Sequence, residues 1–235
     1  MTDTAIILAG GLGTRLRNTI NNVPKPMAPI DGKPFLYYLL KYLEKNKIRH
    51  VLLSVGYKKE IISEYFGNRF KSIEIKYSEE SSPLGTGGAI ARGLNKLSSK
   101  RTFIINGDTY FNISLKSLEN MHNKKNSSVT IAVKKITEPD RYDCVSFNSG
   151  SKIIGFNNKN SLTKYINGGI SIVDIDKFNQ FRLPRKFSFE SDFLFKYYKK
   201  ENFYTYKSKA YFIDIGIPES YSQFNITMQR KNSNK

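Results

Sequence analysis

The most informative feature of this chain is the segment Ile6-Ile7-Leu8-Ala9-Gly10-Gly11-Leu12-Gly13-Thr14-Arg15-Leu16. A short apolar run leads into a turn rich in glycine, and an arginine follows at once. The apolar run predicts a buried strand that ends in a turn. The glycines let a ligand come close to main-chain N–H groups, so the loop can hold an anion. Arg15 adds a planar set of donors that suits phosphate.

A second cation follows in Pro24-Lys25-Pro26. The two prolines restrict the backbone, so that Lys25 presents a point charge to the same phosphates. The loop does not fit the P-loop pattern, which ends in Gly-Lys-Ser/Thr. It does not fit the Rossmann fingerprint G-x-G-x-x-G either, because no glycine stands at the third position of that pattern. An ordinary strand–turn–helix corner is the alternative for the glycines alone. The joint presence of Arg15 and Lys25 favours a phosphate site.

Length and composition suit one large α/β domain. The chain has 235 residues, of which 39% are hydrophobic, and a single cysteine, Cys144, which cannot form an internal disulfide. A lone cysteine fits a reducing compartment. No apolar run reaches the ~20 residues of a membrane span, and no signal peptide precedes the first strand. We therefore expect a cytoplasmic protein without a membrane partner.

The formal net charge of +18 raises the question of nucleic-acid binding. The lysines are scattered among asparagine, serine and tyrosine, and they form no arginine-rich stripe with interleaved aromatic residues. A basic stripe of that kind is the usual footprint of a nucleic-acid site. We therefore expect no nucleic-acid partner, although a positive field would help to attract small polyanions.

Strands alternate with helices along the first half of the chain, which predicts a mostly parallel sheet. Strands are expected at 5–9, 50–55, 73–77, 102–106 and 128–135, and helices at 35–45, 58–66, 87–97 and 114–123. From about residue 136 short strands are expected at 143–147, 152–157 and 166–173. A helix at 190–200 capped by Ser188 or Ser191, a strand at 205–213 and a helix at 218–227 complete the prediction.

Two aspartates are candidate metal ligands. Asp108 and Asp214 each follow an apolar strand and lie close to a glycine. Mg²⁺ prefers one or two carboxylates together with phosphate oxygens and water. An aspartate that merely caps a turn is the alternative for each. Because ligands bind beyond the carboxyl ends of strands in open α/β sheets, Asp108 and the glycine-rich loop are expected at the same sheet edge.

Five motifs in order resemble the sugar-phosphate nucleotidyltransferases, which join a nucleoside triphosphate to a sugar 1-phosphate and release pyrophosphate. They are residues 8–16 with 24–26, 83–89 (Pro-Leu-Gly-Thr-Gly-Gly-Ala), 106–108 (Asn-Gly-Asp), 167–170 (Asn-Gly-Gly-Ile) and 214–218 (Asp-Ile-Gly-Ile-Pro). The resemblance implies an α/β fold, a Rossmann-like three-layer sandwich with a mostly parallel mixed sheet. It implies one domain over 1–235, with a nucleotide-binding half to about 135, a sugar-phosphate half over about 136–228 and a flexible tail at 229–235.

The resemblance also implies roles for single residues. Catalytic roles fall on Arg15 and Lys25, and the metal, Mg²⁺, on Asp108 and Asp214. Nucleotide contacts fall on Leu8, Ala9, Gly10, Gly11, Gly13, Thr14, Glu80, Gly85 and Thr86. Sugar-phosphate contacts fall on Tyr142, Lys159, Asn167, Gly169 and Glu190.

Three of these assignments keep an alternative. Lys159 stands in Asn158-Lys159-Asn160, whereas the family usually has Glu-Lys-Pro, so a solvated surface lysine remains open. Tyr142 fits a core position equally well. Glu190 fits the first turn of a helix, where the helix dipole favours an acid.

Within the family, residues 167–170 and 187–190 look most like the guanylyltransferases that act on D-glycero-α-D-manno-heptose 1-phosphate. That likeness implies GTP and a sugar 1-phosphate as partners, and GDP-heptose for bacterial surface polysaccharide as the product. The alternative is a hexose 1-phosphate enzyme that uses GTP, UTP or dTTP. A regulatory homologue that only binds nucleotide is a further alternative, and the retained charged residues argue against it. The oligomeric state is open between a monomer and a homodimer.

Overall fold

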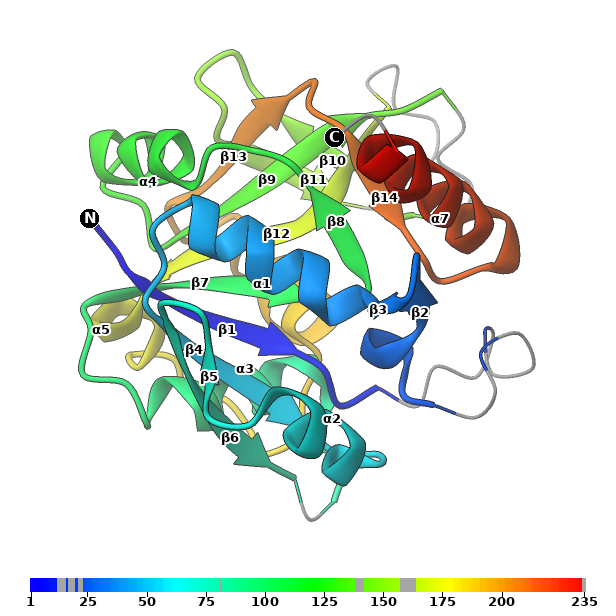
Figure 1. The fold of residues 1–235 in the computed structure, drawn as a ribbon. Coiled ribbons are helices and arrows are strands. Elements are labelled where there is room, and N and C mark those ends of the chain that lie inside the picture. The colour runs from blue at the N-terminus through cyan, green and yellow to red at the C-terminus, as the bar shows by residue number, and fades with distance from the viewer. Residues whose placement is uncertain are drawn as a thin grey trace.

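A central mixed sheet organises the computed structural model, which describes residues 1–11, 16, 20, 23–80, 82–137, 142–156 and 164–233. Its strands are β1 (Thr4–Leu8), β4 (His50–Val55), β5 (Arg69–Phe70), β6 (Ile73–Glu79), β7 (Arg101–Asn106), β9 (Val129–Lys135), β12 (Tyr165–Asp174) and β13 (Phe203–Ser208). The strand order is β13-β9-β12-β7-β1-β4-β6-β5 (Figure 1). β1 runs parallel to β4 and β7, and β12 runs antiparallel to β7 and β9. The predicted mostly parallel mixed sheet is confirmed.

Helices cover both faces of this sheet. One face carries α1 (Phe35–Lys45), α2 (Lys59–Phe66), α4 (Leu115–Lys124) and α7 (Pro218–Ser233). The other carries α3 (Gly85–Leu94), α5 (Ile175–Phe178), the π-helical turn η3 (Phe189–Leu194), α6 (Phe195–Tyr197) and the hairpin of β10 (Val145–Phe147) with β11 (Ile153–Phe156). Figure 1 shows α1 in front of the sheet with α3 and α5 behind it. The three-layer sandwich is confirmed.

Alternation along the strands divides the core in two. Ala5 and Ile7 of β1 face the cluster under α1, whereas Ile6 faces the cluster under α3. Successive side chains of a strand point to opposite faces, so an all-apolar strand is buried on both sides. This is why the run at 5–8 reads as continuously apolar.

Besides the β10–β11 hairpin, two further short antiparallel pairs lie outside the central sheet among the described residues. β8 (Thr109–Phe111) pairs with β14 (Phe212–Asp214), and β2 (Pro29–Ile30) pairs with β3 (Lys33–Pro34). The 3-10 turn η2 (Lys25–Met27) precedes β2. Among the described residues, no helix is both long and apolar enough to cross a membrane.

The structure corrects several expected boundaries. The strand expected at 205–213 is two strands, because the chain leaves the central sheet after Ser208 and then pairs with β8. The helix expected at 190–200 begins with a π-helical turn at Phe189 and ends at Tyr197, and Ser188 caps it by accepting from Ser191 N at 3.2 Å. α3 begins at Gly85, earlier than expected.

The last helix is longer than expected. α7 continues past residue 227 to Ser233, so the expected tail at 229–235 is helical as far as Ser233. Phe224 and Met228 are buried in the core, and no proline or glycine follows to end the helix. Burial of Met228 therefore stabilises the last turns of α7, which the polar residues around it do not predict.

Candidate active site

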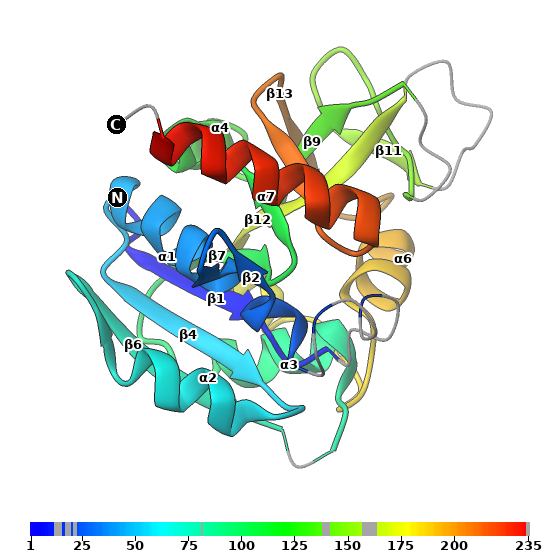
Figure 2. The same cartoon turned by 45° about the vertical axis from the view of Figure 1, so that its right-hand side comes forward.

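The strands β1, β4 and β7 end together at one edge of the sheet. Ala9 N donates to Ser54 O at 2.8 Å, and Gly107 N donates to Leu8 O at 3.0 Å. A Cβ on Gly107 would lie only 2.4 Å from Leu8 O, so a side chain does not fit there. Figure 2 shows the arrowheads of β1 and β4 pointing the same way. The three outgoing loops therefore pack backbone against backbone.

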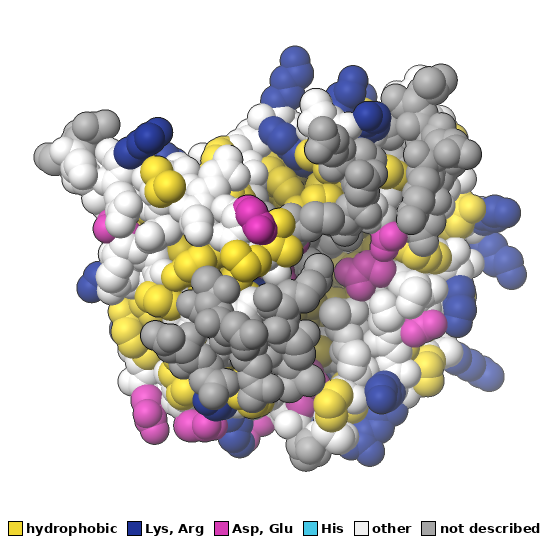
Figure 3. Space-filling model, turned by 90° about the vertical axis from the view of Figure 1, so that its right-hand side faces the viewer, with side chains coloured by type: hydrophobic (Ala, Val, Ile, Leu, Met, Phe, Trp, Pro, Cys, Tyr) yellow, Lys and Arg dark blue, Asp and Glu magenta, His cyan; other side chains and the backbone are white. Residues whose placement is uncertain are grey.

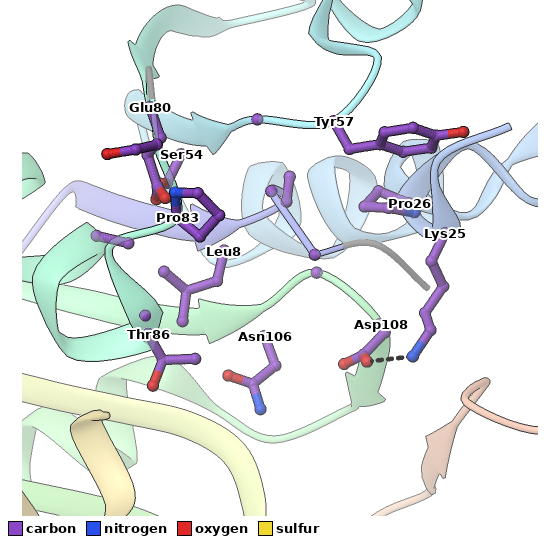
Figure 4. A pocket seen from close by; sticks show the side chains of 18 residues that line it. Leu8, Lys25, Pro26, Ser54, Tyr57, Glu80, Pro83, Thr86, Asn106 and Asp108 are labelled. Carbon is purple, nitrogen blue, oxygen red and sulfur yellow. Dashed lines mark hydrogen bonds and ion pairs between the residues drawn. The ribbon is translucent and has the colours of Figure 1, made fainter. Parts of the chain in front are cut away.

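A pocket of about 540 Å³ opens at this edge, within the size range of small-molecule sites. Its lining includes all the described residues expected to bind nucleotide, together with Lys25 and Asp108: Leu8, Ala9, Gly10, Gly11, Lys25, Glu80, Gly85, Thr86 and Asp108. Figure 4 shows these groups arranged around the ends of the strands. Figure 3 shows the face on which this edge opens, where some acidic side chains lie toward the middle and others at the lower left margin, and most Lys and Arg side chains stand at the margins.

One end of the pocket carries an ion pair. Lys25 Nζ lies 2.7 Å from Asp108 Oδ2, and Thr109 Oγ1 donates to Asp108 Oδ1 at 3.1 Å. Lys25 comes from η2, between its two prolines, and its side chain is only 11% exposed. The constrained turn thus delivers an ammonium directly to the carboxylate at the end of β7, as the dashed line in Figure 4 marks.

Asp214 lies beside this ion pair. Pairing of β14 with β8 sets Asp214 opposite Thr109, and Ile215 N donates to Asp108 O at 3.0 Å. A Cβ built on Gly216 would lie 2.7 Å from Asp214 Oδ1 and 3.5 Å from Lys25 Nζ, so both groups border the same point. The two carboxylates predicted as metal ligands are therefore neighbours in space.

Asp108 and Asp214 form a site with only two carboxylates among the described residues. The described parts of the chain contain no group of three or more His, Cys, Asp or Glu side chains suited to a metal. An ion held here would take its remaining ligands from water and from a bound substrate. Mg²⁺ binds in this way at phosphate-transfer sites, so the donor set of Asp108 and Asp214 fits it.

Glu80 marks the opposite end of the pocket. Its Oε1 accepts from Ser54 Oγ at 3.2 Å and its Oε2 accepts from Leu84 N at 3.1 Å. These two bonds fix the carboxylate at the lining of the pocket, next to Pro83 in Figure 4. Each carboxylate oxygen can accept a further hydrogen bond, so Glu80 can still receive donors from a ligand.

The turn at 167–170 lies near the end of the pocket that holds the Lys25–Asp108 ion pair. Gly169 N donates to Asn167 Oδ1 at 3.1 Å, and Gly169 has a φ of +72°, which favours glycine. A Cβ on Gly169 would lie 3.1 Å from Thr109 Cβ. The pairing of β12 with β9 is irregular at this turn. The irregularity brings Asn167 and Gly169 close to β8, which begins directly after Asp108.

Glu190, in η3, lies next to Thr86 of α3. Its Oε2 accepts from Thr86 Oγ1 at 3.0 Å, which ties it to the wall of the pocket. Tyr142 does not line this pocket. Its ring packs edge-on against Phe212 at 6.0 Å between ring centroids, on the strand that ends at Asp214. Four expected site residues, Gly13, Thr14, Arg15 and Lys159, lie outside the described residues.

Sequence reasoning missed four residues that line the pocket: Ser54, Gly56, Tyr57 and Ser82. Ser54 is a buried hydroxyl in an otherwise apolar strand. A Cβ on Gly56 would lie 3.2 Å from Gly10 O, so the loops after β1 and β4 touch there. Ser54 near the end of β4, together with Gly56 just after the strand, is a combined signal for this part of the site, although neither residue indicates it alone.

Comparison with known proteins agrees with this geometry. The model of the Nucleotidyl transferase family matches residues 4–231. The chain is 46% identical to the D-glycero-alpha-D-manno-heptose 1-phosphate guanylyltransferase of Aneurinibacillus thermoaerophilus, over 96% of this chain and 98% of that protein. Its identity to the enzyme of the same name from Campylobacter jejuni is also 46%, and the match covers 94% of this chain and 98% of that protein.

A solved structure resembles the chain over its whole length. HddC from Yersinia pseudotuberculosis, complexed with GMP-PN, has a TM-score of 0.84 and 34% identity, and the match covers 97% of this chain and all of that one. A family match over nearly every residue agrees with the strand-end pocket and its paired lysine and aspartate. The chain belongs to the nucleotidyl transferase family.

Proposed function

We propose that this chain transfers a guanylyl group from GTP to D-glycero-α-D-manno-heptose 1-phosphate, giving GDP-heptose and pyrophosphate. The observation that carries the proposal is the pocket itself, which sets the Lys25–Asp108 pair at one end and Glu80 at the other. A nucleoside triphosphate needs cationic neutralisation at its phosphates and hydrogen-bonding groups at its base. Similarity to two enzymes named for this activity supports the choice of substrates.

The reaction forms one bond and breaks one. An oxygen of the sugar phosphate attacks the α-phosphorus of GTP, and the bond from that phosphorus to the bridging oxygen breaks. Pyrophosphate leaves with the electron pair. Catalysis of such a step rests on positioning and on neutralising negative charge. Lys25 supplies a fixed ammonium for this purpose, and Arg15 is proposed to supply a second cation.

Asp108 and Asp214 are proposed to hold Mg²⁺. The ion would supply charge neutralisation at the phosphates of the substrates. Because Asp108 Oδ1 is bound by Thr109 and its Oδ2 by Lys25, the carboxylate is held in one orientation before any ligand arrives. Lys25 would then share its hydrogen bonds between Asp108 and a phosphate oxygen.

The remaining residues are proposed to select the substrates. Glu80 would accept hydrogen bonds from the N1–H and the exocyclic amine of guanine, donors that the other common bases do not present together. Asn167, Gly169 and Glu190 would contact sugar hydroxyls, and Lys159 the acceptor phosphate. We also propose that the protein works in the cytoplasm and that its product serves a surface polysaccharide.

A pyrophosphate-release assay tests the proposal. Purified protein is incubated with Mg²⁺, each of the four nucleoside triphosphates and a panel of sugar 1-phosphates. Turnover should be fastest with GTP and the manno-configured heptose 1-phosphate. Asp108→Asn, which is nearly isosteric, serves as the inactive control. Turnover only with UTP or dTTP would overturn the proposal. So would a lack of turnover with every sugar 1-phosphate in the panel.

A further inference from the structure

The chain segment 187–190, here called the latch, is bound to the start of α3. Phe187 N donates to Leu84 O at 3.0 Å, and Phe187 O accepts from Gly87 N at 3.0 Å and from Gly88 N at 3.3 Å. The first-turn amides of Gly87 and Gly88 are thus bonded within the protein itself. They are not available to the phosphates or the base of a nucleotide.

The glycines of the 85–88 segment serve this contact. A Cβ on Gly85 would lie 2.5 Å from Phe187 O, and a Cβ on Gly87 would lie 2.1 Å from the Phe187 ring. Gly85 also has a φ of +74°. A glycine-rich loop can thus have two purposes, close approach of a ligand or close approach of protein. Here the second purpose accounts for both glycines.

Thr86 connects the latch to the pocket. Its Oγ1 accepts from Phe189 N at 2.9 Å and donates to Glu190 Oε2 at 3.0 Å, and the residue also lines the pocket. A hydroxyl has one proton to donate. Because Glu190 receives that proton, the side chain of Thr86 has none left for an acceptor atom of a nucleotide base.

Glu190 is oriented through the same oxygen. Ser188 Oγ also donates to Glu190 Oε2, at 3.4 Å. Within the part of the chain that the structure describes, Oε1 of Glu190 has no hydrogen-bond partner. The residue belongs to the π-helical turn η3, a kind of irregularity that is frequent at functional sites. One carboxylate oxygen is thus fixed by the protein, and the other can still accept a hydrogen bond.

We infer that Thr86 is a positioning residue for the sugar acceptor, which aims Glu190 at a hydroxyl of the sugar, and that its side chain does not contact the base. The inference rests on the proposed function. The inference explains why Thr86, on the helix that borders the pocket, makes both of its side-chain hydrogen bonds to the latch. Loss of the hydroxyl would free Glu190 to rotate, and affinity for the acceptor would fall while nucleotide affinity stays.

Steady-state kinetics of Thr86→Val and Thr86→Ser test this inference. Valine keeps the shape and removes the hydroxyl, and serine restores it. Thr86→Val should raise KM for the sugar 1-phosphate about tenfold, the scale of one hydrogen bond to a charged group. KM for GTP should change less than about threefold, and Thr86→Ser should recover most of the loss. Glu190→Gln combined with Thr86→Val should be no worse than Glu190→Gln alone, because the two residues act through one contact.

Thr205→Val is the matched control. It removes a buried hydroxyl that donates to Ser151 O at 3.3 Å, far along the chain from the pocket lining, and Ser151 O keeps its bond from Thr205 N. Its kinetics should equal those of the unmodified protein. A larger effect of Thr86→Val on KM for GTP, or additive losses in the double variant, would overturn the inference and leave the proposed function standing. An unmodified protein without turnover on any sugar 1-phosphate would overturn both.

Discussion

Lys25 Nζ lies 2.7 Å from Asp108 Oδ2, although the two residues stand 83 positions apart in the sequence. The side chains are 11% and 33% exposed, so the pair is partly shielded from water. Removing one partner of such a pair leaves the other charge without compensation. The pair therefore contributes to local stability and also fixes a positive charge at one end of the pocket.

Lys25→Ala should lower kcat by about 10²-fold or more, because a fixed charge beside a reacting phosphate is lost. Lys25→Met, which keeps most of the stem, separates loss of charge from loss of packing. Both variants should lower kcat alike, as measured by pyrophosphate release at saturating substrates. Lys41, exposed on α1, provides the control Lys41→Met, which should leave kcat unchanged. A Lys25 variant that raises only KM for the sugar would contradict the phosphate role.

Asp108→Asn should abolish most turnover, since it removes a charge that Mg²⁺ needs while preserving size. The apparent requirement for Mg²⁺ should move to higher concentration in a titration of residual activity. Far-UV circular dichroism should be unchanged, which separates a chemical defect from misfolding. A near-normal rate at low Mg²⁺ would remove Asp108 from the proposed metal site.

Much of the fold follows from short-range sequence pattern. The run at 5–8 and the leucine spacing in α1 each predict an element whose type the structure confirms. The split between β13 and β14 was not predictable in the same way. Phe212 and Asp214 leave the central sheet because β8 offers a partner about a hundred residues earlier in the chain, and no local pattern reports that pairing.

The candidate site shows the same difference between features that a local pattern predicts and contacts between distant residues. Lys25 and Asp108 were predicted as separate motifs. The rule that strand ends converge places the glycine-rich loop and Asp108 at one sheet edge, but it does not predict the contact between Lys25 and Asp108. The latch at Phe187 was not predicted, because a glycine gives the same signal whether a ligand or a phenyl ring comes close. Ser54 was missed because one hydroxyl in an apolar strand carries little signal on its own.

Glu80→Gln should weaken guanine selectivity. Glutamine still offers an oxygen to Leu84 N, but it loses the negative charge that would accept from two guanine donors. We expect KM for GTP to rise about tenfold or more, with little change in the low rate for UTP. The ratio of kcat/KM for the two nucleotides is the measurement. An unchanged ratio would mean that the Glu80 carboxylate only holds the turn before α3.

Gly87→Ala should destabilise the protein in spite of a better helix propensity. Alanine is favoured over glycine by about 1 kcal/mol inside a helix, but its Cβ would meet the Phe187 ring at 2.1 Å. Overpacking of this kind costs about 1–3 kcal/mol, or more where the neighbour cannot shift. Chemical denaturation measures the difference. Gly11→Ala is the control, because a Cβ there has no neighbour within 4 Å among the described residues and should leave the unfolding free energy nearly unchanged.

The acceptor preference can be measured directly. Mannose 1-phosphate lacks the additional terminal hydroxymethyl group of the heptose, so a pocket that hydrogen-bonds this group should favour the heptose. With GTP saturating, we expect a higher kcat/KM for the heptose 1-phosphate by about tenfold or more. Equal specificity constants for the two sugars would contradict heptose selectivity and leave the guanylyl transfer itself intact.

His122 gives a prediction for stability against pH. It is buried in α4, its Nδ1 lies 3.0 Å from Thr130 Oγ1, and its Nε2 has no hydrogen-bond partner among the described residues. Burial, assisted by the positive charges of Arg101 and Lys177 and opposed by Asp174, lowers the pKa of His122 to about 4. The unfolded chain therefore takes up this proton first, near pH 6.5.

The sign of the effect follows from that order. Above about pH 6.5 the histidine is neutral in both states, and between about pH 6.5 and 4 only the unfolded state is protonated. The free energy of unfolding should fall by about 2 kcal/mol between pH 7 and pH 5 on account of this residue. Urea denaturation at several pH values measures the slope. His122→Gln cannot titrate and should flatten it, whereas His50→Gln, at an exposed position beside Glu74, should keep it because His122 is still present. Equal slopes in the His122→Gln variant and the unmodified protein would assign the acid sensitivity to other groups.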